Sequence, residues 1–139
     1  MNLARYILVV LFGLPISVID LRSRRIPNRL LAIMGAGGVL IYLTATRQLL
    51  AALICACLCA LLLFPISLFR GAGLGAGDIK LIIALALILG RGAHILAALI
   101  LACVFGLIQI VVLALWRRKV PRSIAFAPAL IAGALLAIQ

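Results

Sequence analysis

Two aspartates, Asp20 and Asp78, are the only acidic side chains in a chain of 139 residues that carries 13 Lys and Arg residues. Two carboxyl groups held within hydrogen-bond reach do not both ionise readily, so they share a proton. The ionised carboxylate can then take a proton from water while the protonated carboxyl polarises a carbonyl group. If the fold brings Asp20 and Asp78 together, the pair is equipped to hydrolyse a peptide bond.

Each aspartate also has a purely structural interpretation. Asp20 could be neutralised by the arginines that follow it, and Asp78 could cap the start of a helix. Those roles do not explain why the loops contain no other acid, so a functional pair is favoured. Helix polarity then predicts that Asp78, at a helix N-terminus, ionises more readily than Asp20, which lies near a C-terminus.

The segments that carry the two acids are expected to lie in a membrane. Hydrophobic residues make up 68% of the chain and the mean hydropathy is +1.44, whereas a soluble domain needs far more polar surface. Apolar runs long enough to cross a bilayer recur throughout. We therefore expect one domain over residues 1–139, folded as an all-α, polytopic transmembrane helix bundle. Six spans are predicted, at roughly 5–21, 29–46, 48–69, 78–91, 93–116 and 123–138, and fusion of the fourth and fifth would leave five.

The distribution of basic residues predicts the orientation of these spans. Ten Lys and Arg residues fall after the first span, between the third and fourth, or before the sixth, and three fall on the opposite side. Because positively charged loops stay in the cytoplasm, both termini are predicted to lie outside. Asp20 and Asp78 then share one cytoplasmic depth, where acids usually mark a functional site. The net charge of +11 is explained by topology, and no nucleic-acid partner is expected.

A glycine-rich stretch precedes Asp78, with glycines at positions 71, 73, 75 and 77. Four glycines in seven residues disfavour a helix and leave a backbone that another chain can approach closely. A protease needs such a backbone to hold an extended substrate, although a flexible connection between spans is the alternative. Lys80 is predicted to point away from Asp20, toward lipid phosphate or a loop carbonyl group.

No metal or cofactor is expected from the cysteines. Cys55, Cys57, Cys59 and Cys103 all fall inside apolar spans. Their spacing lacks the C-x-x-C pair of a zinc site, and no histidine lies near them. Packing is the expected role of these side chains.

The sequence around the two aspartates resembles the type IV prepilin peptidase family. Residues 75–81 read G-A-G-D-I-K-L, which matches the family pattern G-x-G-D-x-K-L. Asp20 stands ahead of Ile26-Pro27-Asn28, as in the family's other signature. Residues 125–128, A-F-A-P, are loosely similar to its final stretch, because alanines replace a proline and a glycine. The resemblance covers nearly the whole chain.

This resemblance implies a GxGD-type membrane aspartyl endopeptidase in which Asp20 and Asp78 are catalytic. It implies cleavage of the short, basic leader of prepilin or pseudopilin signal peptides at the cytoplasmic edge of the bacterial inner membrane, among membrane lipids. It also implies that several further residues shape the substrate site, namely Pro27, Asn28, Gly75, Gly77 and Lys80.

Longer members of the family carry a cytoplasmic region between the first two spans, often with two C-x-x-C pairs. Here that loop has only about eight residues, 21–28. The chain therefore resembles the minimal form found with Tad/Flp-type pili, and no S-adenosylmethionine site is expected.

Two other functions remain open at this point. The acids could form the relay of a small proton-linked transporter, although a relay would place acids at several depths. The chain could also be a catalytically silent membrane component of a pilus or secretion assembly.

Overall fold

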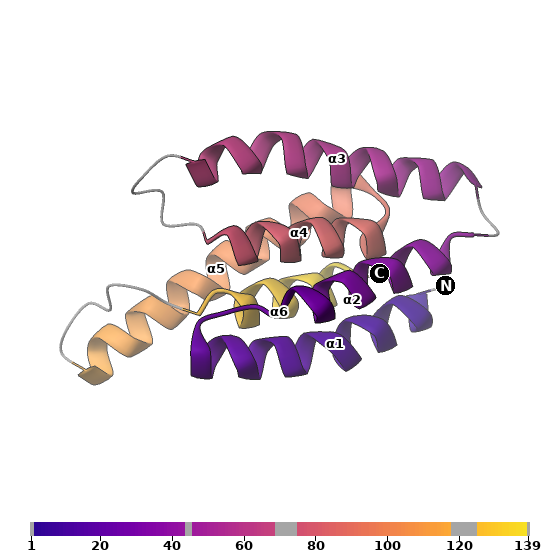
Figure 1. The fold of residues 1–139 in the computed structure, drawn as a ribbon. Coiled ribbons are helices and arrows are strands. Elements are labelled where there is room, and N and C mark those ends of the chain that lie inside the picture. The colour runs from indigo at the N-terminus through magenta and orange to yellow at the C-terminus, as the bar shows by residue number, and fades with distance from the viewer. Residues whose placement is uncertain (1, 44–45, 69–74, 118–124, 139) are drawn as a thin grey trace.

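The computed structural model describes residues 2–43, 46–68, 75–117 and 125–138 (Figure 1). The described residues form six α-helices joined by short connections, which confirms the all-α prediction. The helices follow the order of the six predicted segments: α1 (Asn2–Ser23), α2 (Asn28–Ile41), α3 (Thr46–Leu68), α4 (Ala76–Leu89), α5 (Gly92–Arg117) and α6 (Ala127–Ala137).

Three of these helices, α1, α3 and α5, are long and apolar enough to cross a membrane. The other three have 14, 14 and 11 residues. At 1.5 Å per residue they rise only about 17–21 Å, against a hydrocarbon core of about 30 Å. Two are shorter than predicted: α2 ends at Ile41, well before the expected boundary at 46, and α6 begins at Ala127, where Pro128 favours the first turn of a helix.

A left-handed glycine separates α4 from α5. Gly90 has φ +69° and forms the C-cap of α4, with its N–H bonded to the carbonyl oxygen of Ala86. This conformation favours glycine and ends the helix. The fourth and fifth predicted segments therefore form two separate helices.

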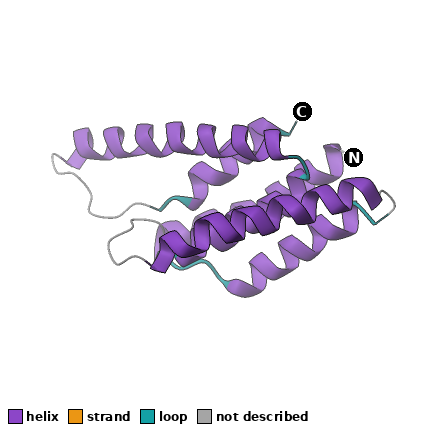
Figure 2. Ribbon diagram, turned by 90° about the horizontal axis from the view of Figure 1, so that it is seen from above, coloured by secondary structure: helices purple, strands orange, loops and turns teal. Residues whose placement is uncertain are grey.

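Helix α4 lies at the centre of the bundle and packs against α2 on one side and α3 on another (Figure 1). Helix α6 packs against α1 and α5. The view from above shows that the helices cross at angles instead of running parallel (Figure 2). Leu81 of α4 and Leu130 of α6 are fully buried, whereas Leu61 of α3 and Leu115 of α5 are more than 70% exposed. The outer helices thus present apolar side chains as a lipid-facing surface would.

Glycines let α6 approach its neighbours closely. A Cβ atom at Gly133 would collide with the carbonyl oxygen of Ala98 and lie 2.9 Å from the backbone nitrogen of Ala102. A Cβ atom at Gly13 of α1 would lie 2.8 Å from the side chain of Ile131. Small residues at helix crossings permit such close packing in membranes. The middle of α6 is therefore held closely against α1 on one side and α5 on the other.

Four helix ends gather at one end of the bundle. Helix α1 ends there, and α2, α4 and α6 begin there (Figure 1). This arrangement brings side chains from distant parts of the sequence into one region.

Candidate active site

Asp20, in the last turns of α1, and Asp78, in the first turn of α4, line one pocket of about 380 Å³. The structure thereby brings together the chain's only two acids. Of the five residues predicted to shape the site, Asn28, Gly75, Gly77 and Lys80 also line this pocket. Pro27 does not line it and instead forms the N-cap of α2, where its carbonyl oxygen accepts hydrogen bonds from the N–H groups of residues 30 and 31.

Asp20 is buried, with 6% of its surface exposed, and meets the N-terminus of α6. The backbone N–H of Ala127 donates a hydrogen bond of 3.2 Å to Asp20 Oδ2. A helix N-terminus favours a negative charge because its N–H groups have no partner within the helix. The sequence interpretation missed this contact. Pro128, typical of the first turn of a helix, was the available sign that a helix begins here.

Asp78 is half-buried and lies outside the three long candidate spans. Burial and, to a smaller extent, the nearby charge of Asp20 raise the pKa of its carboxyl group to about 6, against the lowering effect of a hydrogen bond with the Gly75 backbone. The raised pKa of Asp78 is opposite to the shift that helix polarity alone suggested for this residue. Desolvation and repulsion by Asp20 outweigh the polarity of α4, and Asp20 itself meets a helix N-terminus.

A left-handed residue turns the chain at the end of α1. Arg24 has φ 51°, and its N–H bonds to the carbonyl oxygen of Asp20 at 2.9 Å. This conformation costs a non-glycine residue roughly 1–2 kcal/mol. The turn places Arg24 and Arg25 on the wall of the acid pocket, together with Ile26.

The two sequence motifs touch at a glycine. A Cβ atom at Gly77 would lie 3.3 Å from Cβ of Ile26, which is tighter than ordinary van der Waals contact. A Cβ atom at Gly75 would lie 3.4 Å from Asp78 Oδ2. Glycine at positions 75 and 77 thus leaves room for the Ile26 segment beside the carboxyl group of Asp78. The other two glycines of the stretch, Gly71 and Gly73, lie outside the described residues.

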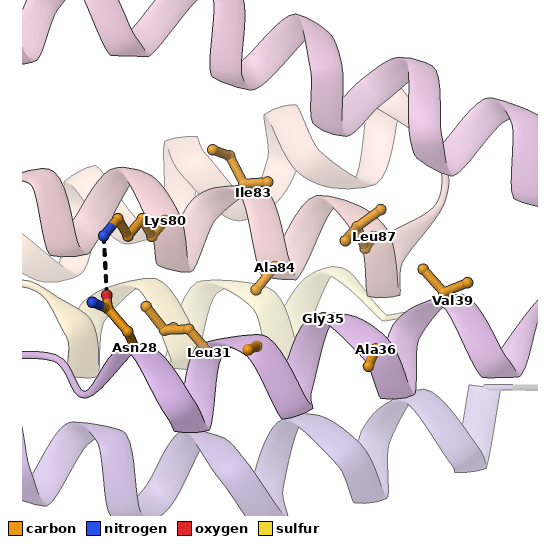
Figure 3. A pocket seen from close by; sticks show the side chains of 10 residues that line it. Asn28, Leu31, Gly35, Ala36, Val39, Lys80, Ile83, Ala84 and Leu87 are labelled. Atoms are coloured by element: carbon orange, nitrogen blue, oxygen red, sulfur yellow. Dashed lines mark hydrogen bonds between the residues drawn. The ribbon is translucent and has the colours of Figure 1, made fainter.

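Lys80 has a different partner from the one predicted. Its Nζ atom donates a hydrogen bond of 3.0 Å to Asn28 Oδ1, and both side chains are exposed (Figure 3). Lys80 also lines the pocket that holds both acids, and its partner is the Asn28 side chain rather than the predicted lipid phosphate or loop carbonyl group. The helical spacing from Asp78 did not account for α2, which places Asn28 within reach.

The pocket therefore offers two carboxyl groups, cationic side chains and exposed glycine backbone. Among the described residues, no group of three His, Cys, Asp or Glu side chains comes together. The cysteines lie on α3 and α5, and none of the described ones lines the acid pocket. Asp20 and Asp78 are thus placed where a pair of carboxyl groups could carry out acid–base catalysis.

Comparison with known proteins agrees with this chemistry. The model of the type IV leader peptidase family matches residues 7–111, which include both acids and end within α5. No curated protein and no solved structure matches the chain. The family match covers most of the sequence, so the chain belongs to the type IV leader peptidase family and is an aspartic-type prepilin peptidase of a membrane.

Proposed function

We propose that Asp20 and Asp78 are the catalytic pair of this peptidase. One observation carries the proposal: the only two acidic side chains of the chain come from different helices and line the same pocket. The charge of Asp20 also acts on the carboxyl group of Asp78, as a proton-sharing pair requires.

The surroundings of the two acids suggest different roles for them. Asp20, beside the Ala127 N–H, is the ionised member and takes a proton from the attacking water. Asp78, whose pKa is raised, is the protonated member and donates its proton to the scissile carbonyl oxygen. The tetrahedral intermediate then collapses: the C–N bond breaks, the proton on Asp20 goes to the leaving amine, and Asp78 recovers its own proton.

Residues around the pair shape the substrate site. Gly75 and Gly77 leave backbone accessible beside Asp78, where an extended substrate can pair with it. Asn28 and Lys80 form the polar bridge at the edge of the pocket. Pro27 acts indirectly, because it begins the helix that carries Asn28.

The chain is proposed to form one domain over residues 1–139, with six segments in the membrane and both termini outside. The end of the bundle that holds the acids carries Arg22, Arg24, Arg25 and Arg29, and the opposite end carries Arg5, Arg47 and Arg91. By the positive-inside rule, the acid pocket then faces the cytoplasm. A reporter fused after residue 139 should be active outside the cytoplasm, and cytoplasmic activity would contradict this topology.

The substrate is proposed to be the short, basic leader of a Flp-type prepilin or pseudopilin at the bacterial inner membrane. The connection between α1 and α2 supports a minimal peptidase, because only residues 24–27 separate the two helices. That length leaves no room there for an additional region, and N-methylation of the product is not proposed.

Co-expression with a Flp-type prepilin tests the catalytic assignment. Asp20→Asn and Asp78→Asn should each reduce leader removal by about 10²–10⁴-fold, the usual contribution of acid–base groups. An asparagine at position 20 can still accept the Ala127 hydrogen bond, so insertion and folding should be retained. Cleavage at the normal rate by either variant, measured by gel shift, would refute the pair.

A further inference from the structure

A second hollow lies between α2 and α4, next to the acid pocket (Figure 3). Its volume is about 410 Å³ and its wall is mostly apolar. Ala32, Gly35 and Ala36 form its α2 side, and Ile83 and Leu87 belong to its α4 side. Ala32 and Ala36 are exposed and lie one helical turn apart, so the hollow is a groove floored by small side chains.

The groove is continuous with the acid pocket. Asn28 and Lys80 line both hollows, and the hydrogen bond between them marks the boundary (Figure 3). On one side of this boundary the wall carries Asp20, Asp78 and two arginines. On the other side, Asn28 and Lys80 are the only polar side chains of the wall among the described residues. Polarity therefore changes sharply where one hollow meets the other.

The length of the groove suits a piece of helix. From Asn28 to Val39 the α2 wall rises about 16 Å, which is three turns and roughly half of a hydrocarbon core. Small residues on one helix allow another helix to approach closely in a membrane. The groove can therefore hold about eleven residues of an apolar helix whose polar end reaches the acids.

We infer that this groove binds the apolar helical segment of the prepilin immediately after the scissile bond. The inference rests on the proposed function, since it assigns the acid pocket to the scissile bond. A polypeptide that is cut between Asp20 and Asp78 extends from the pocket on both sides of the scissile bond. The groove provides an apolar surface for one of these two sides. A phospholipid acyl chain is the competing occupant, and crosslinking distinguishes it from the substrate.

Photo-crosslinking tests where the segment lies. Single photoreactive residues are placed about 4, 8 and 11 positions after the scissile bond of a full-length prepilin, which is bound to the Asp78→Asn enzyme so that it is not cut. We expect crosslinks to α2 and α4, moving from the Asn28 end toward Val39 as the label moves along the substrate. Crosslinks to α3 and α5, or to lipid alone, would overturn the inference.

Variants that fill the groove provide a kinetic test. Ala36→Phe should raise KM for full-length prepilin by about tenfold or more, because it occupies space that an apolar ligand needs, with kcat little changed. Ala32→Leu should act in the same direction, and thermal unfolding in detergent shows that each variant is folded. Cys57→Phe is the matched control, since Cys57 is exposed on α3 and lines neither hollow.

These experiments distinguish failure of the groove assignment from failure of the proposed function. If the wild-type enzyme cleaves prepilin and Ala36→Phe has the KM of the Cys57→Phe control, the groove assignment is wrong and the catalytic pair stands. If the wild-type enzyme cleaves no prepilin under conditions that preserve its fold, the proposed function itself fails, and the groove assignment fails with it.

Discussion

Lys80 Nζ and Asn28 Oδ1 are joined by a hydrogen bond of 3.0 Å that links the start of α4 to the start of α2. Each residue belongs to one of the two sequence motifs that flank the aspartates. The bond therefore ties the two motifs together at the edge of the acid pocket. It also stands where that pocket meets the apolar groove.

Removal of either partner should weaken catalysis modestly. We expect Lys80→Ala and Asn28→Ala each to lower kcat/KM on prepilin by less than about tenfold, because both side chains are exposed and water can take the place of the missing partner. The double variant should be no worse than the poorer single variant, since the two act through one bond. Arg22→Ala is the control, because Arg22 is exposed nearby but does not line the pocket. Fully additive losses would show that the residues act separately.

The rate of cleavage should fall as the pH rises through about 6. Burial raises the pKa of Asp78 to about 6, so its carboxyl group holds the proton needed for catalysis below that pH and loses it above. The descending limb of kcat/KM against pH should therefore have an apparent pKa near 6, which belongs to the pair as a unit.

The Gly75→Pro substitution tests whether the descending limb of the pH profile moves in the expected direction. The φ of Gly75 is −70°, which proline adopts, and proline removes the N–H that lowers the pKa of Asp78. The descending limb should then move to higher pH. A shift to lower pH, or no limb at all in the wild-type profile, would contradict the role of Asp78 as the proton donor.

Alanine at Gly106 should disturb the active site from a distance. A Cβ atom at Gly106 would lie 2.8 Å from the ring of Phe126, the residue just before Ala127. Displacement of that ring should shift the N–H that contacts Asp20, with an expected loss of about tenfold in kcat, typical of a misplaced supporting group. Gly92→Ala on the same helix is the control, because its Cβ atom would make only an ordinary contact of 3.8 Å with Cys55. Equal activities of the two variants would refute this supporting role.

The Gly77→Ala substitution should lower the activity, and a second substitution at Ile26 should restore part of it. Its Cβ atom would lie 3.3 Å from Cβ of Ile26 and push the two motifs apart, so kcat/KM should fall by about tenfold. Ile26→Val removes Cδ1, which would lie 3.4 Å from the added Cβ atom, and should restore part of the loss, as measured by prepilin cleavage. If Ile26→Val instead adds to the defect, the contact between Gly77 and Ile26 is not the cause.

The sequence was sufficient for the features that depend on periodic patterns. The order of the six helices and the separate α4 and α5 follow from apolar runs and their interruption near Gly90. The meeting of Asp20 with Asp78 follows from two helix ends at one end of the bundle. The family motifs were local enough to be recognised without the fold, and the match over residues 7–111 confirms the family.

The missed features depend on tertiary contacts. The donor to Asp20 is a backbone group 107 residues away, and a backbone N–H leaves no trace in the identity of Ala127. The raised pKa of Asp78 depends mainly on burial, which outweighs the helix polarity that the sequence suggests. The direction of Lys80 depends on where α2 places Asn28, and a helical wheel for α4 contains no such information.

The contact between Asp20 and Ala127 has a consequence for the order of events during synthesis. At about 5–20 residues per second, a ribosome adds Ala127 roughly 5–20 s after Asp20, because 107 positions separate the two. During the last part of that interval, from the addition of Asp78 to that of Ala127, the nascent chain contains both acids while Asp20 still has no donor from α6. We expect a partly synthesised peptidase to be inert toward neighbouring chains in the same membrane, so that its proteolytic capacity is delayed by its own translation.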